Sequence, residues 1–230
     1  MGASERPVPA RPEPAAFYAR PAEIVAPALL GGLLVSTIDG IETSGRIVET
    51  EAYVGPHDPA SHAAERIGRT VRNRSMFGVP GIAYVYRIYG VHWCLNIVTD
   101  RVEYPAAVLI RAIEPVSGIE TMRRRRGVPF AEFADAGLGS GPGKLAAALG
   151  ITGAIDGHPL DRPPLIVARF DVPSESAIAR GPRVGITRAA DWPLRFFIRG
   201  NPHVSKRGAA GPRSDAVHPS LRSPRLRGSA

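Results

Sequence analysis

Cysteine is almost absent from this 230-residue chain, which contains only Cys94. A single thiol excludes a disulfide framework, an iron–sulfur cluster held by cysteines and a cysteine-rich zinc site. Proteins of reducing compartments have few or no disulfides, so this composition leads us to expect a cytoplasmic location.

Long apolar runs are also missing. No stretch of about 18 apolar residues, the length that crosses a bilayer as a helix, occurs, and we expect no membrane association. Residues 1–20 contain Glu5, Glu13 and several prolines without an apolar core, so they do not predict a secretion signal. Hydrophobic residues still make up 44% of the chain, which is enough to bury a sizeable core.

Lysine is the third scarce residue, because only Lys144 and Lys206 occur and nearly all positive charge is arginine. The formal net charge of +8 suggests a nucleic-acid partner. However, residues 206–230 hold six basic residues against one acidic residue and so supply +5 of that charge. The net charge therefore describes the C-terminal segment more than any binding face.

The chain divides into one predicted domain and two tails. Residues 1–15 are rich in proline and alanine and are predicted to be disordered. Residues 207–230 lack a periodic apolar pattern and are predicted to form a disordered basic tail. Residues 16–206 remain as a single folded domain.

Short helices and β-rich runs alternate inside this domain. The alternation in Arg46–Val54 predicts a strand. Further strands are predicted at Ile82–Tyr89, His92–Val98, Ala106–Ile113, Leu165–Ala168, Arg183–Ile186 and Leu194–Ile198. Helices are predicted at Ala22–Leu30, Ser117–Arg126 and Gly143–Leu149. Strands joined by short turns favour an α+β fold, a single domain with a largely antiparallel β-sheet core and surrounding helices.

Acidic and aromatic residues alternate along the first predicted strand. Side chains alternate with period two, so Glu49, Glu51 and Tyr53 would share one face. Such a face either serves chemistry or is the solvent-exposed side of an edge strand. Tyr53 and Tyr86, on neighbouring strands, would sandwich a flat ligand, and their electron-rich rings would attract a cationic purine.

The long loop between these strands, residues 55–80, is rich in groups that bind ions. Its His57, Asp58 and His62, together with Glu49, permit a metal-site interpretation. Phosphate contacts are the second interpretation, and an ordinary solvated loop is the third. The residues suited to phosphate are Arg66, Arg69, Arg72, Arg74 and Asn73.

A glycine-rich segment, LGSGPGKLAAAL, starts at Leu138 and resembles a phosphate loop. It departs from that motif because Leu138 replaces the first glycine and Leu145 replaces the magnesium-binding Ser or Thr. Two interpretations remain open. Lys144 makes a single phosphate contact near a helix N-terminus, or Ser140 is simply the N-cap of that helix.

Several motifs in a fixed order carry a more specific signal. They are VETEAYVGPHDPASHA, RNRSMFGVPGIAYVYRIYGVHWCLNIV, AAVLIRAIEPVSGIETMRRRRG, SGPGKLAAALGI and PRVGITRAADWPLRFFIRGNPHVS. From about Tyr18 to Ser205 the chain resembles the alkyladenine (3-methyladenine) DNA glycosylase family. The resemblance implies a cofactor-free monomer without a metal, which excises alkylated or deaminated purines from double-stranded DNA.

The resemblance also implies roles for individual residues. Glu51 is similar to the general base that deprotonates the attacking water, with Arg111 and the carbonyl of Val184 holding that water. The implied base pocket consists of Tyr53, His62, Tyr86 and Asn96, of which Asn96 disfavours the amine of normal guanine. Tyr89 resembles the wedge that fills the gap in the DNA, with Val91 beside it. The implied phosphate contacts are Arg72, Arg74 and Lys144.

General chemistry agrees with this implication. An enzyme reaches a base in a duplex only by extruding it, and a carboxylate stabilises the oxocarbenium-like sugar while it activates water. No lysine lies in the motif that carries Glu51, so we expect hydrolysis without strand cleavage through a Schiff base. A binding module that keeps the scaffold without turnover is the remaining alternative.

Overall fold

A computed structural model describes residues 11–128 and 134–205. Most of the two segments predicted to be disordered, 1–15 and 207–230, lies outside these ranges. Within the described N-terminal part, Pro12 pairs with Ala168 in an isolated bridge, and a short helix, α1, spans Ala15–Tyr18. The chain therefore joins the domain just before the boundary suggested by composition.

One antiparallel sheet organises the described residues, and its path runs in the order β3-β4-β5-β2-β1-β7-β6. Strand β9 pairs with β2, and β8 pairs with β9. The strands are β1 (Leu33–Ser36), β2 (Thr43–Tyr53), β3 (Ala83–Ile88), β4 (His92–Thr99), β5 (Ala106–Ser117), β6 (Asp161–Arg162), β7 (Leu165–Ala168), β8 (Ile178–Gly181) and β9 (Arg195–Ile198). The predicted α+β class with a largely antiparallel core is confirmed.

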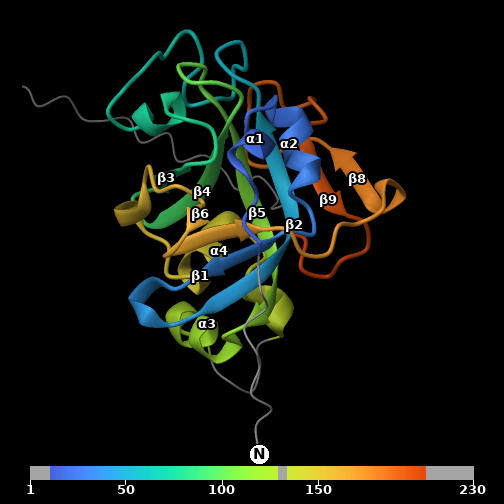
Figure 1. Ribbon diagram of the computed structural model, residues 1–230. Coiled ribbons are helices and arrows are strands. Elements are labelled where there is room, and N and C mark those ends of the chain that lie inside the picture. Colours follow the sequence, from blue (N-terminus) through green and yellow to red (C-terminus); the bar gives the residue numbers. More distant parts are fainter. Residues whose placement is uncertain (1–10, 129–133, 206–230) are drawn as a thin grey trace, which may run out of the picture.

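Three further helices cover the sheet: α2 (Ala22–Ala28), α3 (Ile119–Arg126) and α4 (Pro142–Ala148). Figure 1 shows α1 and α2 beside one end of β2 and α3 at the opposite end of the sheet. The hydroxyl of Thr50 in β2 donates to the carbonyl of Ala26 in α2 at 2.9 Å, which fixes helix to strand. None of the described helices has the length and apolar character that a membrane span requires.

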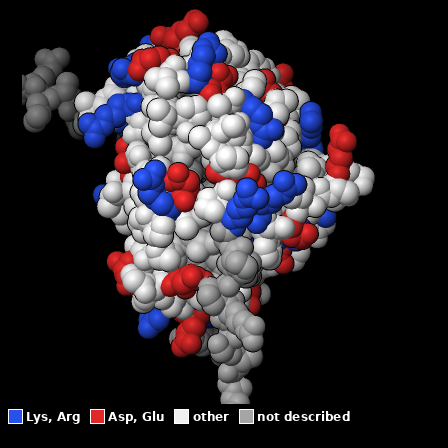
Figure 2. All heavy atoms as spheres, in the orientation of Figure 1, with Lys and Arg blue, Asp and Glu red and all other residues white. Residues whose placement is uncertain are grey.

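Short 3-10 turns complete the secondary structure at Ile38–Gly40, Arg74–Phe77, Asp135–Gly137, Gly153–Ile155 and Glu175–Ala177. The long loop after β2 extends beyond the end of β3 and β4 (Figure 1). Acidic and basic side chains are interspersed over the face seen in Figure 2. That face therefore presents no continuous basic surface, in keeping with the small net charge outside the C-terminal segment.

Strand β2 pairs with two strands, β1 and β9, along one edge. Its first half, through Arg46, pairs with β1, and its second half, Glu49 to Glu51, pairs with β9. Along the other edge it pairs with β5, where the register shifts on both sides of Glu49. Because irregularities of this kind re-aim side chains, Arg111 of β5 comes to contact both acids of β2.

The structure differs from the sequence predictions in three local features. Residues Arg183–Ile186 form a loop rather than a strand, because the Val184 N–H bonds to a side chain and Gly185 has a φ of +77°. Ser140 is not a helix cap, since α4 starts after Gly141 and has no side-chain cap. The helix predicted from Ser117 begins later because β5 extends to that residue and Gly118 turns the chain with a φ of +69°.

Candidate active site

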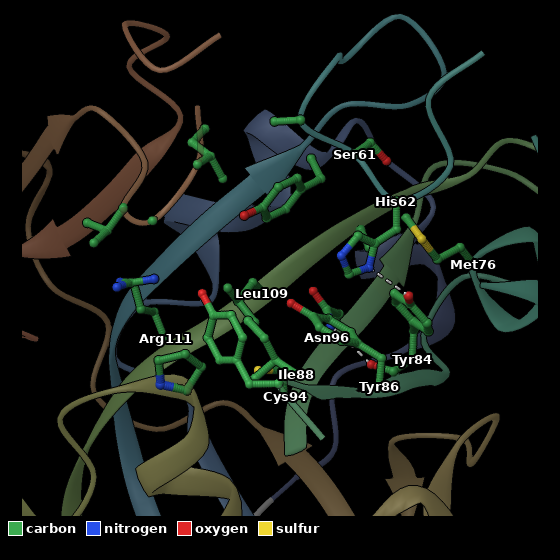
Figure 3. A pocket seen from close by; sticks show the side chains of 18 residues that line it. Ser61, His62, Met76, Tyr84, Tyr86, Ile88, Cys94, Asn96, Leu109 and Arg111 are labelled. Atoms are coloured by element: carbon green, nitrogen blue, oxygen red, sulfur yellow. Dashed lines mark hydrogen bonds between the residues drawn. The ribbon is translucent and has the colours of Figure 1, made fainter. Parts of the chain in front are cut away.

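A cavity of about 260 Å³ lies between the loop after β2, the ends of β3 to β5 and the loop after β8. In Figure 3, Arg111 lies on one side of this cavity, opposite His62, Met76 and Tyr84. The predicted site residues that line it are Tyr53, His62, Tyr86, Tyr89, Asn96, Arg111 and Val184. The fold thus brings together residues from six separate parts of the chain, namely β2, the loop after it, β3 with its turn, β4, β5 and the loop after β8.

Glu51 is fully buried and contacts three residues that line this cavity, namely Tyr53, Arg111 and Val184. Its Oε1 accepts a hydrogen bond of 2.7 Å from the Val184 N–H and lies 3.4 Å from Nη1 of Arg111. The Tyr53 hydroxyl donates to its Oε2 at 3.3 Å. Burial raises the pKa of Glu51 above its ordinary value, and the Arg111 charge opposes this rise. The carboxylate is therefore more basic than that of an ordinary glutamate and is held in one position.

Glu49 points to the same face, and the alternative of a solvent-exposed acidic edge is wrong because Glu49 is also fully buried. Its carboxylate binds Nε of Arg195 at 2.5 Å and Nε of Arg111 at 3.2 Å. The backbone N–H and hydroxyl of Ser205 donate to it at 2.7 and 3.0 Å. Glu49 thus holds Arg111 in place behind Glu51.

A further buried ion pair joins the two loops that border the cavity. Asp58 and Arg183 are both fully buried, and two hydrogen bonds of 2.5 and 2.9 Å connect them. Arg183 also donates to the Ala52 carbonyl at 2.9 Å and lies over the Tyr53 ring at 4.7 Å. These contacts fix both loops, and the Tyr53 ring, to the end of β2.

The metal-site interpretation is not supported by the arrangement of its four candidate ligands. Glu49 and Asp58 are each committed to arginines, and His57 lies 3.4 Å from the Tyr104 hydroxyl. Across residues 11–128 and 134–205, no three His, Cys, Asp or Glu side chains converge as metal ligands would.

Aromatic rings form the other wall of the cavity. Nδ1 of His62 lies 3.0 Å from the Tyr84 hydroxyl, and the His62 ring meets the Tyr86 ring edge-on with centroids 4.4 Å apart. Burial, together with the nearby Arg72 charge, lowers the pKa of His62 to about 4. The imidazole is therefore neutral near pH 7, and the hydroxyl of Tyr84 has the partner that a buried tyrosine needs.

Asn96 lies on β4 opposite Tyr84 and is buried in the cavity wall. Its amide nitrogen donates to the Tyr84 carbonyl at 3.2 Å (Figure 3). This bond fixes the orientation of the amide. Cys94, two residues earlier on the strand, lines the same cavity.

The turn between β3 and β4 presents two apolar side chains to solvent. Tyr89 is 86% exposed and Val91 is 65% exposed. Tyr89 has a φ of +52° and Gly90 a φ of +68°, as a tight hairpin turn requires. Tyr89 also borders the cavity, so a large ring projects from its rim.

The residues expected to contact phosphate differ in their surroundings. The Arg72 guanidinium lies over the Tyr86 ring at 5.4 Å and donates to the Arg87 carbonyl at 3.1 Å. Arg74 and Lys144 are exposed. Asn73 is not available, because it is buried and its amide donates to the His62 and Gly68 carbonyls.

Sequence reasoning missed three contributors to this site, namely Arg183, Arg195 and Ser205. Each contacts an acid of β2 or of the following loop from more than 120 residues further along the chain. No local pattern marks them. The signal that existed was the motif running from Pro182 to Ser205, which contains all three.

An aromatic cavity of about 260 Å³ has room for one flat base rather than a stretch of duplex, and a nucleotide would have to leave the helix to enter it. A buried carboxylate in contact with the lining of such a cavity is suited to activate a water molecule for hydrolysis. This combination is found in the DNA N-glycosylases, enzymes that extrude a base before they cleave it from the strand.

Comparison with known proteins identifies the family. The model of the methylpurine-DNA glycosylase family matches residues 16–202, and the chain therefore belongs to this family. It is 50% identical over 189 residues to a Rhodopseudomonas palustris (strain HaA2) protein assigned as a 3-methyladenine DNA glycosylase, covering 82% of this chain and 88% of the relative. Proteins with the same assignment are 46% identical in Myxococcus xanthus (88% and 98% covered) and 50% identical in Methanoculleus marisnigri (84% and 98% covered). The chain is thus a DNA N-glycosylase of base excision repair.

Proposed function

We propose that the enzyme removes alkylated and deaminated purines from duplex DNA, the class that includes 3-methyladenine, 7-methylguanine, hypoxanthine and ethenoadenine. Hydrolysis by a water that Glu51 activates would leave an intact strand with an abasic site, without lyase activity. The observation that carries this proposal is the buried Glu51 carboxylate, held by Val184 and Arg111, two residues that line the aromatic cavity. We expect the enzyme to act as a monomer on DNA in the cytoplasm.

The geometry around Glu51 supports the role of general base. One carboxylate oxygen is engaged by Val184 and Arg111, whereas the other has only the long bond from Tyr53. The latter oxygen is the one available to accept a proton from water. As the glycosidic bond breaks, the negative charge of Glu51 also stabilises the positive charge that develops on the sugar.

The aromatic wall supports recognition of damaged purines. Tyr53, His62 and Tyr86 offer faces and edges for stacking, and tyrosine rings attract a base that carries positive charge after alkylation. We propose that Asn96 discriminates against normal guanine by occupying, with its fixed amide group, space in the cavity wall that the exocyclic amine would need.

Contacts to the DNA backbone are proposed for Arg74 and Lys144, which are exposed, and for Arg72. Arg72 differs from the other two, because its guanidinium is already held over Tyr86. Its loss should therefore affect the base pocket as well as the salt dependence of binding.

The pH dependence of base release follows from the pKa of Glu51. A general base acts only when ionised, so the single-turnover rate should rise with pH until the raised pKa of Glu51 is passed. Arg111→Gln removes the charge that opposes this rise and should move the midpoint to still higher pH. His62, with a pKa of about 4, should add no inflection above pH 5. A profile that is flat from pH 4 to 8 in both proteins would contradict this assignment.

Tyr89→Ala should weaken extrusion of the damaged nucleotide. A ring on the rim of the cavity can occupy the space that the base leaves, and stacking on bases is worth roughly 1–3 kcal/mol, so the extruded state should become about 5- to 150-fold less populated. A fluorescent base next to the lesion reports extrusion directly. The change in fluorescence should shrink, while the melting temperature stays close to that of the wild type.

Phe170→Ala is the matched control for Tyr89→Ala, because Phe170 is another exposed aromatic residue and lies after β7, at the far side of the sheet. It should leave the fluorescence change intact. Normal extrusion in Tyr89→Ala, together with a large drop in melting temperature, would show that Tyr89 is a packing residue instead.

Removal of residues 206–230 should weaken non-specific DNA binding and reduce its salt dependence without altering single-turnover chemistry. The segment carries +5 of the net charge, and neutralised phosphates set the salt slope. Ser205 must be retained because it binds Glu49. A chain shortened by one further residue should be less stable; loss of the chemical step in the chain ending at Ser205 would contradict the prediction.

A panel of duplexes, each with a single damaged purine, tests the proposed function. We expect release of free base from several of them, in excess chelator as well as without it. A protein that binds these duplexes but releases no base would instead be a binding module on a glycosylase scaffold.

A further inference from the structure

A second cavity, of about 200 Å³, adjoins the base pocket. It lies between the loop after β2 and the loop after β8, and both cavities share Ala60, Gly185 and Ile186 in their walls. A group in the second cavity would therefore be next to a nucleotide whose base occupies the first.

Two arginines line this second cavity, one from each loop. Arg66 and Arg188 are exposed, and neither has a hydrogen bond or ion pair within the described part of the chain. Other arginines of these loops are committed: Arg69 binds Glu103 and Arg183 binds Asp58. Two unpaired positive charges at one cavity indicate an anionic ligand.

The backbone of the second loop adds unused donors. The Val184 N–H is taken by Glu51, but the four following amides, residues 185–188, donate no hydrogen bond to any described group. Positive φ angles at Gly185 and Ala189, +77° and +45°, hold this segment away from strand geometry. Free backbone N–H groups in a turn are a common way to bind anions.

The two loops are also fixed relative to each other. The buried Asp58–Arg183 pair joins them below the cavity. Asp58 further accepts a 3.0 Å bond from the Ala60 N–H, and the Glu65 N–H donates to the Pro56 carbonyl at 2.9 Å. The cavity is thus built on a rigid base, as an anion site needs to be to bind without a large ordering cost.

We propose that this cavity binds a phosphodiester group of the DNA strand that carries the extruded nucleotide, through Arg66 and Arg188. The ligand is a singly charged tetrahedral anion, for which two arginines and free amides are suited. Its position beside the base pocket means that the phosphate is one of those flanking the lesion. The site deepens the proposed function and rests on it, since it keeps the sugar in place as the base turns into the pocket.

The test is a double-mutant cycle between the protein and the DNA. The protein variant is Arg66→Gln/Arg188→Gln, and each phosphate near the lesion is replaced in turn by a neutral methylphosphonate in a duplex with an abasic-site analogue. The matched control is Arg169→Gln, which removes an exposed and unpaired arginine after β7, far from the cavity. Binding is measured over a range of salt concentrations.

The double variant should bind the unmodified duplex about tenfold or more weakly, because charged hydrogen bonds are lost, and its salt slope should fall by about one phosphate contact. One methylphosphonate next to the lesion should weaken DNA binding by the wild type to a similar extent and should hardly change DNA binding by the double variant. At other positions the two losses should add.

Several results would overturn the proposal. The double variant could bind DNA as tightly as Arg169→Gln does. Alternatively, at every methylphosphonate position the loss of binding could simply add to the loss caused by the protein substitutions. Inorganic phosphate, at matched ionic strength, could also stabilise the wild type but not the double variant, while no methylphosphonate position in the DNA stands out from the others. The site would then bind free phosphate rather than the DNA backbone. Base release by the wild type is measured separately. If the arginines and one phosphate are coupled but no base is released, the result counts against the glycosylase mechanism and not against this site.

Discussion

Replacement of Glu51 by glutamine is expected to slow base release by about 10²–10⁴-fold and to leave binding of the damaged duplex largely intact. Glutamine keeps the shape of the side chain, and its carbonyl oxygen can still accept the Val184 N–H. It cannot take a proton from water. Single-turnover kinetics on a duplex with one lesion measures the chemical step without product release.

The same substitution should stabilise the fold near neutral pH. Burial raises the folded-state pKa of Glu51, so the native protein binds a proton more tightly than the unfolded chain does. Stability therefore falls as pH rises from the ordinary glutamate pKa to the raised one, and the loss persists above it. Glu51→Gln lacks this loss, so its advantage in melting temperature should be present at pH 7 and absent below the ordinary glutamate pKa.

Glu103→Gln is the control for both measurements, because Glu103 is an exposed acid that pairs with Arg69 outside the cavity. It should keep wild-type kinetics and stability. If Glu51→Gln reacted within about threefold of the wild type, Glu51 would not be the general base.

Asp58→Ala should destabilise the protein by about 3–5 kcal/mol, because it leaves the Arg183 charge buried without a partner. Both side chains are fully buried and joined by two hydrogen bonds. Urea unfolding measures the loss, provided that the slope of the transition stays unchanged. Since Arg183 also contacts Tyr53 and the end of β2, single-turnover rates should fall as well.

Glu103→Ala is the matched comparison for Asp58→Ala, since it removes one partner of an exposed Arg–carboxylate pair. Surface pairs contribute about 0–1 kcal/mol, so its effect should be small. Equal losses in the two variants would mean that the Asp58–Arg183 pair does not fix the loops as described.

Local periodicity predicted most strands of the sheet, though not β1, β6 or β8, and one side of the site. Alternation in β2 correctly placed Glu49 and Glu51 on one face, where both contact Arg111. The expectation that Tyr53 and Tyr86 lie on neighbouring strands is wrong, because β4 and β5 lie between β2 and β3, yet both residues line the same cavity. A period of two depends only on backbone geometry, which neighbouring residues determine.

The other side of the site depends on contacts between distant residues. The bond from Val184 to Glu51 spans 133 residues, and that from Ser205 to Glu49 spans 156. Nothing near Val184 in the sequence marks its N–H as a partner for a carboxylate. The apolar alternation around Val184 predicted a strand instead. A local pattern does not reveal that the Val184 N–H donates to the Glu51 carboxylate and is therefore unavailable for a hydrogen bond to a neighbouring strand.

The roles assigned to Asn96, Tyr89 and Val91 came from the family resemblance rather than from their local sequence. The structure adds physical content to them. Two large apolar side chains lie exposed at one turn, and one of them borders the cavity. A solvent-exposed tyrosine in the left-handed region is costly to maintain without a function.

The most direct test of the account is the product of a single turnover on a duplex with one 7-methylguanine, in water enriched in ¹⁸O and with borohydride present in a parallel reaction. Hydrolysis by a Glu51-activated water predicts free 7-methylguanine, an unbroken strand with ¹⁸O at C1′ of the abasic sugar, and no trapped enzyme–DNA adduct. In Glu51→Gln the same products should form about 10²–10⁴-fold more slowly. A trapped adduct or a cleaved strand with the wild type would contradict the account.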